Sequence, residues 1–331
     1  MDISQGPKLV MIGGGTGSFT LLSGLKQYVN DITALVSMAD DGGSTGQLRD
    51  ELGVLPPGDV RQCLVALSNS PKARELFNYR FEEGTLKGHA FGNLFLTALE
   101  KMTGDFAQAI ELASDVLRIT GNVEPITLSN IKLCMKTPKG TKISGEFKIG
   151  QTDFNTSRPE FWLEPKAVLN PKAKEAILKA DMVIIAPGNL YASLAPALIV
   201  PGLGDALKKS NAKKIYVCNL VTKPGQTDGF KVHDFASEVE RLSGHKFLDF
   251  VLFNTSKPSD ELLQKYAHDG EFAVNIDNEP LKAAHYRAHG AEIISERYHK
   301  PKKSDLIGES RTLIRHDPIK TAKQIMRIYF S

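Results

Sequence analysis

Short apolar runs along this chain alternate with stretches in which apolar residues recur at helical spacing. Residues 9–12 form a continuous apolar run, as is typical of a strand buried on both faces in a parallel sheet. Four glycines follow within 13–17, and apolar residues then recur at helical intervals over 21–29. The pattern predicts a strand, a tight loop and a helix that begins near Gly17.

The same alternation continues to the end of the chain. Strands are predicted at Ile32–Met38, Met182–Ala186, Ile215–Leu220 and Phe247–Phe253, and helices at Leu94–Met102, Asp105–Leu117, Pro171–Ala180, Glu261–Tyr266 and Asp317–Phe330. Between about 130 and 163 the segments become short and alternating around Pro138-Lys139-Gly140, which indicates a hairpin, with 160–163 as an edge strand. We expect this part to serve as structural cover.

Together these elements predict one α/β nucleotide-binding domain over 1–331. The expected architecture is a Rossmann-like three-layer sandwich with a mostly parallel sheet. An antiparallel β-hairpin is inserted at about 130–163, and a helical C-terminal segment covers about 300–331.

Composition narrows the class of protein. Of 331 residues, 41% are hydrophobic and 24% charged, which is ordinary for a globular protein, and a net charge of +3 is too small to imply nucleic acid. The N-terminal residues lack a signal-peptide pattern, and no apolar run approaches the ~20 residues of a membrane span. We therefore expect a cytoplasmic location. Cys63, Cys134 and Cys218 lie far apart without a CxxC pair, so we expect buried thiols rather than a disulfide or zinc site.

The glycine cluster is the first candidate for chemistry. Backbone amides at a helix N-terminus bind anions where no side chain intervenes, and this loop offers Gly13, Gly14, Gly15, Thr16 and Gly17. Ser18 stands where the dinucleotide fingerprint has its third glycine, and no Gly-Lys-Ser/Thr follows as in a Walker A loop. A phosphate site and a tight turn without a ligand both remain open.

Acidic residues follow the next two apolar segments. Asp40, Asp41 and Gly42 end the second strand, where a carboxylate accepts ribose hydroxyls in dinucleotide folds or helps to hold Mg²⁺ against a diphosphate. A simple turn is the alternative. Asp59 follows a proline-rich loop, where it is either a helix N-cap or a ligand contact, together with Arg61 for phosphate.

Three later loops are polar and rich in glycine. The first, 88–93, contains His89 and Asn93. The other two follow predicted strands. The carboxyl ends of such strands are where ligands bind in open α/β sheets. Their candidate residues are Pro187, Gly188, Asn189 and Tyr191 in one, and Asn219, Thr222 and Asp228 in the other.

Six motifs taken together resemble the bacterial gluconeogenesis factor family, within the wider superfamily of 2-phospho-L-lactate transferase. They are Gly13-Gly-Gly-Thr-Gly17, Ala39-Asp-Asp-Gly-Gly-Ser44, Pro56-Pro-Gly-Asp59, Gly88-His-x-Phe-Gly-Asn93, Pro187-Gly-x-Leu-Tyr191 and Pro224-Gly-x-Thr-Asp-Gly229. The resemblance covers nearly the whole chain. It implies a cytoplasmic protein that binds a UDP-sugar, such as UDP-N-acetylglucosamine, or a dinucleotide, and that supports cell shape and wall synthesis on gluconeogenic carbon sources.

The resemblance also assigns residues. It implies that Tyr266 and Arg315 contact the nucleotide sugar and that Asp59 faces a substrate. The chain departs from the family pattern at four positions. Ala186, Asn189 and Ala192 replace Gly, Ser and Thr, which removes two hydroxyls, and Gln226 stands where Glu is common.

Two functions follow as hypotheses. The first is a nucleotide-sugar-binding regulatory protein without turnover, whose occupied form is read by a protein partner in cell-wall synthesis. The second is a Mg²⁺-dependent transferase that uses a nucleoside diphosphate donor, with Asp59 as the catalytic candidate and Asp40 and Asp41 as metal ligands. A dehydrogenase ranks third because the fingerprint is incomplete. The physiological ligand, a metal requirement and a homo-oligomer remain open at this point.

Overall fold

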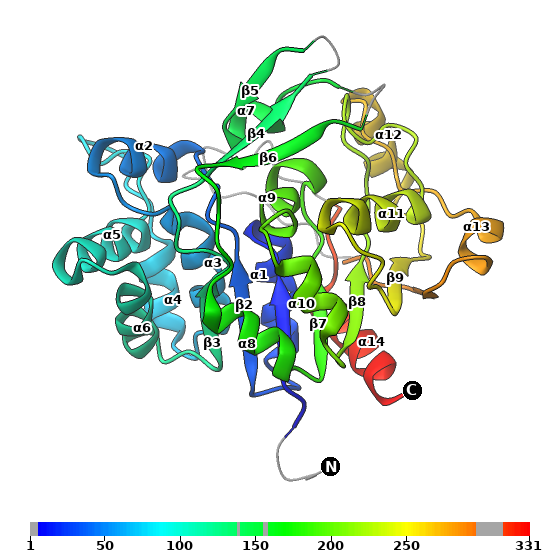
Figure 1. Ribbon diagram of the computed structural model, residues 1–331, viewed down its shortest axis with the longest axis horizontal. Coiled ribbons are helices and arrows are strands. Elements are labelled where there is room, and N and C mark those ends of the chain that lie inside the picture. Colours follow the sequence, from blue (N-terminus) through cyan, green and yellow to red (C-terminus); the bar gives the residue numbers. More distant parts are fainter. Residues whose placement is uncertain (1–5, 138–139, 155–157, 296–313) are drawn as a thin grey trace.

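The computed structural model describes residues 6–137, 140–154, 158–295 and 314–331 and shows a parallel sheet between layers of helices (Figure 1). Its seven strands have the order β10-β9-β8-β7-β1-β2-β3, and all neighbours pair in parallel. The strands are β1 (Leu9–Ile12), β2 (Ile32–Val36), β3 (Asn122–Pro125), β7 (Met182–Ile185), β8 (Lys213–Val217), β9 (Phe250–Asn254) and β10 (Arg287–Ala291). The expected α/β class is confirmed.

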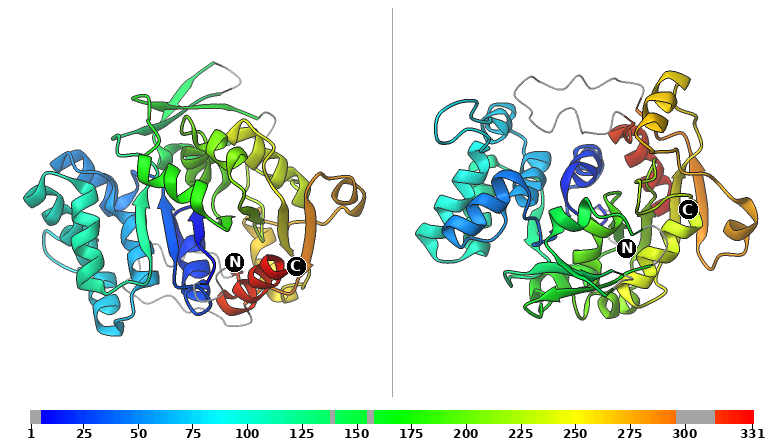
Figure 2. Two further views of the ribbon diagram at one scale, coloured as in Figure 1. Left: turned by 60° about the horizontal axis from the view of Figure 1, so that its bottom comes forward. Right: turned by 90° about the horizontal axis from the view of Figure 1, so that it is seen from above.

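Helices cover both faces of this sheet (Figure 2). Helices α1 (Gly15–Leu25) and α14 (Pro318–Phe330) pack together on one face, and α8 (Pro171–Lys179) and α10 (Leu203–Lys209) pack together on the other. The remaining helices outside the insertion are α2 (Gly43–Leu52), α3 (Pro57–Leu67), α4 (Pro71–Asn78), α5 (Phe91–Thr103), α6 (Phe106–Leu117), the π-helical turn η1 (Leu190–Leu194), α9 (Ala195–Leu198), α11 (Val232–Ser243), α12 (Asp260–His268) and α13 (Asn278–Lys282).

The order of the strands reverses at β1. Leu9 pairs with Ile32 of β2 on one side and with Met182 of β7 on the other. The chain therefore leaves β1 in one direction and returns much later to its other side. Such a reversal leaves a crevice at the carboxyl ends of the two central strands, where the connecting helices diverge. The loops that follow β1 and β7 meet at this crevice.

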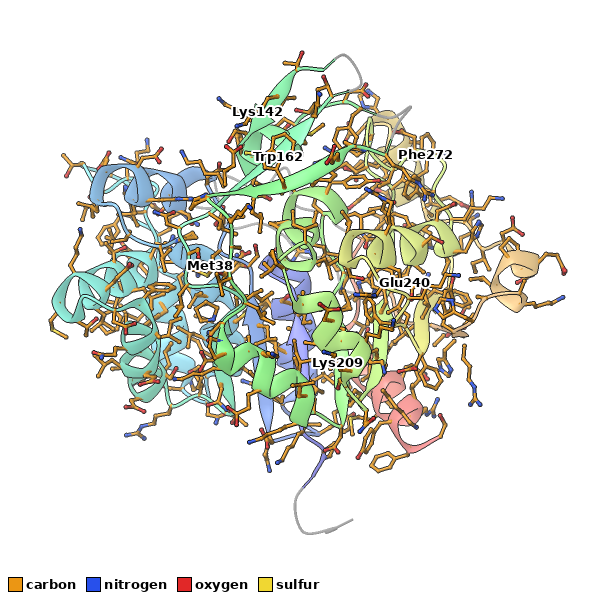
Figure 3. The ribbon with its side chains drawn as sticks, in the orientation of Figure 1. Met38, Lys142, Trp162, Lys209, Glu240 and Phe272 are labelled. Atoms are coloured by element: carbon orange, nitrogen blue, oxygen red, sulfur yellow. The ribbon has the colours of Figure 1, made fainter. Side chains whose placement is uncertain are left out.

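The insertion forms a small sheet of its own at the carboxyl edge of the large one (Figure 1). Strands β4 (Lys132–Lys136), β5 (Lys142–Ser144) and β6 (Glu160–Glu164) are antiparallel in the order β5-β4-β6. The hairpin and the edge strand are thus present, although 138–139 lie outside the described residues. Lys142 and Trp162 project from this sheet (Figure 3), with the Lys142 ammonium 5.7 Å from the indole centroid.

One local expectation about the insertion is wrong. Residues 146–150 form helix α7 (Glu146–Gly150) rather than a continuation of β5, because Gly145 adopts a positive φ of 109° and turns the chain. The insertion also contacts the loop after β2. The backbone amide of Phe147 donates a hydrogen bond to Oδ1 of Asp41 at 2.8 Å, so α7 adjoins the loop after β2.

Several predicted boundaries also shift. The predicted loop after β2 is short, because α2 begins at Gly43. Asp59 lies within the first turn of α3, whose N-cap is Pro56, so the N-cap expectation is wrong. Asp105 does cap α6 as expected and accepts a hydrogen bond from the amide of Ala107 at 2.7 Å.

The sequence pattern missed both outer strands of the sheet. Strands β3 and β10 read NVEP and RAHGA, and lie at its two edges. An edge strand is buried less completely than a central one, so its sequence carries no continuous apolar run. The pattern also missed helices α2, α4, α9, α10, α11 and α13 and the turn η1.

The apolar core forms one large cluster that includes Leu9 in β1 and Ile328 in α14, and a second, small cluster of Leu220, Tyr266 and Ile314. The three cysteines are free and buried, as expected. Burial raises the pKa of Cys63 and Cys218 well above the usual range of a thiol. Within the described ranges, no single helix is long and apolar enough to cross a membrane, although Leu190–Leu198 and Leu203–Lys209, bent by 73°, meet the criteria as a pair.

Candidate functional site

A cleft of about 450 Å³ opens where the loops after β1, β7 and β8 meet. Its volume lies in the range of small-molecule and cofactor sites. Of the residues predicted from sequence, it gathers Gly14, Gly15, Thr16, Gly17, Pro187, Gly188, Asn189, Asn219, Thr222 and Arg315. These residues come from four separate parts of the chain, and the parallel sheet brings them to one edge.

The glycines in the loop after β1 are explained by close approaches within the protein. A Cβ on Gly17 would lie 1.9 Å from the backbone oxygen of Pro187, and a Cβ on Gly14 would lie 2.0 Å from Oδ2 of Asp59. A side chain at Gly17 would separate the loops after β1 and β7, and a side chain at Gly14 would displace the Asp59 carboxylate. Gly13, by contrast, is buried beneath the cleft and does not line it.

Asp59 accepts a hydrogen bond from the first backbone amide of α1, that of Gly15. The Gly15 N–H donates to Oδ1 of Asp59 at 2.9 Å, at the N-terminus of α1. This amide is one of those that would otherwise face a bound phosphate. The protein therefore places its own carboxylate against the anion-binding end of the helix, beside the cleft.

Asp59 belongs to a group of carboxylates that repel one another. Burial, and then the charge of Asp40, raises the pKa of Asp59 to about 7, against an opposing hydrogen bond from Gly15. Burial and the charges of Asp40, Asp59 and Asp41 raise the pKa of Glu146 to about 8, against the weaker opposing charge of Lys223. Burial likewise raises the pKa of Asp40. At neutral pH part of this group holds protons, and α7 of the insertion supplies one of its members.

Asp40 and Asp41 face different parts of the protein. Oδ1 of Asp40 accepts the Gly42 amide at 3.0 Å, whereas Oδ1 of Asp41 accepts the Phe147 amide at 2.8 Å. Magnesium is bound through one or two carboxylates that share a coordination sphere with phosphate oxygens. The pair as arranged here does not fit an ion held by both carboxylates. Within the described parts of the chain, no three His, Cys, Asp or Glu residues form a group that could hold a metal ion.

His89, Asn93 and Arg61 form a polar network at the start of α2. Ser44 Oγ lies 2.9 Å from Nδ1 of His89 and accepts a hydrogen bond from Asn93 Nδ2 at 3.3 Å. Arg61 donates from Nε to Asn93 Oδ1 at 2.9 Å and from Nη1 to Asn78 Oδ1 at 2.6 Å. Arg61 is buried and engaged by these amides, so the structure places it in a network that orders α2, α3 and α5 rather than in the cleft.

Hydrogen bonds to Phe272 and to the end of α7 hold the loop after β8 in place. The amide of Thr222 donates to the carbonyl of Phe272 at 2.7 Å, and the amide of Phe272 returns a bond to Oγ1 of Thr222 at 3.0 Å. Gln226 is buried and its Nε2 lies within hydrogen-bond distance of three carbonyls at the end of α7, at 2.9, 3.1 and 3.3 Å. An amide can donate there and a carboxylate cannot, so Gln suits this position in this chain.

Tyr266 and Arg315 contribute to one wall of the cleft in different ways. Arg315 lines the cleft, whereas Tyr266 is buried behind it. The hydroxyl of Tyr266 accepts a hydrogen bond from the amide of Ile314 at 2.9 Å, one residue before Arg315. Tyr266 therefore positions the segment that carries the arginine.

Three other predicted residues lie outside the cleft. Tyr191 is buried in an aromatic cluster, with its ring stacked on Phe161 at 5.4 Å and edge-on to Phe154 at 5.1 Å. Asp228 lies farther along the loop after β8, with Oδ2 buried and no hydrogen-bond partner among the described residues. Gly42 precedes α2, donates its amide to Oδ1 of Asp40 and does not line the cleft.

The cleft also contains residues that the sequence patterns did not single out. Lys223, Glu271, Ser193 and His316 line it. His316 is buried and its Nε2 hydrogen-bonds the Cys218 carbonyl at 3.1 Å, while burial lowers its pKa to about 4. The motif at 224–229 begins one residue after Lys223, which was the available signal for that lysine.

Comparison with known proteins identifies the family of this chain. Residues 9–297 match the family model described as 2-phospho-L-lactate transferase CofD. The chain is 42% identical to a putative gluconeogenesis factor of Thermotoga maritima, covering 97% of this chain and 99% of that protein. It is 38% identical to the gluconeogenesis factor of Bacillus subtilis, with 98% of each chain covered. The chain belongs to the gluconeogenesis factor family.

A solved structure of a similar protein confirms the fold. The crystal structure of a UPF0052 family protein from Bacillus halodurans superposes with a TM-score of 0.88 at 37% identity, covering 97% of this chain and 99% of that one. The family resemblance drawn from the six motifs is thereby confirmed. Because the match to the gluconeogenesis factors is nearly full-length, the cleft lies within the part of the chain that the family shares.

Proposed function

We propose that this protein is a regulatory protein that binds a UDP-sugar in the cleft between the loops after β1, β7 and β8. The observation that carries the proposal is the cleft itself, in which the N-terminus of α1 and the side chains of Lys223 and Arg315 line one cavity. Phosphates bind where helix N-termini and cationic side chains converge. The uracil and sugar moieties are suggested by the family resemblance.

In this proposal the ligand acts through conformation rather than turnover. The cleft is lined by loops from separate strands, and Gln226 ties one of them to the insertion. A ligand that binds one arrangement of these loops more tightly than another shifts their populations, and a partner protein would read the difference. The role in cell shape and wall synthesis on gluconeogenic carbon sources belongs to the same proposal, as does a cytoplasmic location.

Calorimetry with UDP-N-acetylglucosamine tests the binding step, with NAD as the comparison for a dinucleotide. We expect heat for the UDP-sugar, and a loss of affinity in Arg315→Gln. The exposed Arg327 at the end of α14 offers a matched control, since Arg327→Gln removes the same charge away from the cleft. No heat and no thermal shift with millimolar UDP-sugar would refute the proposal.

A transferase is the second candidate, favoured by the match to the 2-phospho-L-lactate transferase model and by Asp59 beside the cleft. An acceptor hydroxyl oxygen would attack a phosphorus of a nucleoside diphosphate donor, Asp59 would accept the hydroxyl proton, and nucleoside monophosphate would leave. A carboxylate with a pKa near 7 is suited to such a proton transfer. The test is product formation from candidate donors, with and without Mg²⁺. Activity that vanishes in a folded Asp59→Asn variant would favour this function over binding alone.

A further inference from the structure

The side chain of Lys223 lines the cleft without an ion-pair partner among the described residues. It follows β8, lines the cleft and is partly buried. Within the described part of the chain, its ammonium group forms no hydrogen bond or ion pair. Burial lowers the pKa of Lys223, and the nearby charges of Glu271 and Glu146 oppose that shift. An ammonium group that is partly removed from water, faces a cleft and has no hydrogen-bonding partner among the described residues is reason to look for the group that it serves.

The backbone around Lys223 is fixed from within its own loop. The Lys223 amide donates to Oγ1 of Thr227 at 2.8 Å, and the Lys223 carbonyl accepts the amides of Thr227 at 2.9 Å and Gln226 at 3.1 Å. These bonds close a tight turn through Gly225, whose φ is +70°. The Gln226 amide then anchors the turn to α7. Thr227 and Gln226 thus hold the backbone of the lysine in place and do not line the cleft themselves.

The N-terminus of α1 suggests why the cleft contains a lysine. The α1 N-terminus faces the same cavity, but its Gly15 amide already binds the Asp59 carboxylate. This carboxylate offsets the positive end of the helix dipole. A phosphate at that helix therefore needs additional positive charge nearby, and Lys223 and Arg315 are the cationic side chains that line the cleft.

We propose that Lys223 binds a phosphate group of a nucleoside diphosphate ligand, whose other phosphate lies against the N-terminus of α1. The inference rests on the proposed nucleotide site and narrows its ligand to one that bears at least two phosphates. Lys223 is then the residue that distinguishes a diphosphate from a nucleoside. Glu271, in the same wall, discourages a further anionic group beside the lysine.

The test compares the full-length wild-type protein with Lys223→Gln, Lys223→Met and Lys223→Arg. Lys174→Gln, on the exposed side of α8 and outside the cleft, is the matched control. Uridine, UDP, UDP-N-acetylglucosamine and inorganic pyrophosphate are titrated by calorimetry. We expect Lys223→Gln and Lys223→Met to weaken UDP, the UDP-sugar and pyrophosphate by about tenfold or more, since charge-assisted bonds to phosphate are among the strong ones. Uridine binding should be unchanged, and Lys223→Arg should retain most of the affinity.

Thermal unfolding of each variant separates binding from folding. Because the Lys223 ammonium has no bond within the described protein, its replacement should leave the melting temperature near that of the wild type. Unchanged affinity of Lys223→Gln for UDP, or an equal loss for uridine, overturns the inference while the proposed function stands. If the wild type binds neither the nucleotides nor pyrophosphate, the proposed function and the inference fall together.

Discussion

Asp59→Asn should stabilise the fold at alkaline pH, although it removes a charged residue beside the glycine loop. The substitution keeps the size of the side chain and leaves an oxygen to accept the Gly15 amide, which bonds Oδ1 at 2.9 Å. It removes the negative charge that burial and Asp40 make unfavourable. The change therefore isolates the electrostatic cost of the carboxylate from its geometry.

The magnitude follows from the pKa. In the folded protein the pKa of Asp59 is about 7, compared with an ordinary value of 3.8. At about 1.4 kcal/mol per pKa unit, this shift of roughly 3 units sets a ceiling of about 4 kcal/mol. Part of that cost is shared with Asp40, because removal of either charge relieves the other, so we expect about 1–3 kcal/mol.

The sign of the pH dependence is the reverse of that for a salt-bridged carboxylate. Between about pH 4 and 7 the native state binds a proton at Asp59 that the unfolded state has released, so native stability falls as pH rises through this window. The gain from Asp59→Asn should therefore be small near pH 4 and approach its full size above pH 7. Burial raises the pKa of Glu146 to about 8, which adds a contribution of the same sign.

Urea unfolding at pH 5, 6, 7 and 8 measures the effect, read as the shift of the transition midpoint between variant and wild type. Asp181→Asn is the matched control, because Oδ2 of this exposed aspartate also accepts one backbone amide, that of Lys8 at 2.8 Å. A midpoint difference for Asp59→Asn that stays constant from pH 5 to 8 would refute the reasoning. So would an equal gain in the control.

Three further predictions concern the loops around the cleft. Gln226→Glu should lower the unfolding free energy by about 2 kcal/mol or more in a urea titration, because the new buried carboxylate would face three carbonyls that now accept the Gln226 side-chain amide. Gln226→Met removes the donor without adding a charge, so it should lower the unfolding free energy by less in the same titration. Gly17→Ala should separate the loops after β1 and β7, because its Cβ would fall 1.9 Å from the Pro187 oxygen, and a melting temperature and UDP-sugar affinity equal to wild type would contradict this. Tyr266→Phe should weaken the UDP-sugar several-fold by freeing the Ile314 amide, whereas unchanged calorimetry would leave the tyrosine a purely structural role.

The fold was predictable from sequence where burial leaves a continuous signal. Central strands such as β1 and β7 are buried on both faces, so each forms an apolar run that marks it in the sequence. The outer strands β3 and β10 carry no such run, and their existence depends on the neighbours that complete the sheet. The glycine-bearing loops after β1, β7 and β8 were also recognisable, because each follows an apolar strand.

The chemistry of the cleft was decided by tertiary contacts. The sequence determined that polar loops would follow β1, β7 and β8, and parallel pairing then placed them at one edge of the sheet. It could not show that the Gly15 amide is taken by Asp59, that Glu146 joins the acidic group from the insertion, or that Lys223 faces the cleft. These contacts join residues 44 or more positions apart, and only a folded chain brings such residues within reach of each other. Local propensity sets which segments become strands and helices, whereas hydrogen bonds and charges between distant segments decide what the cleft can bind.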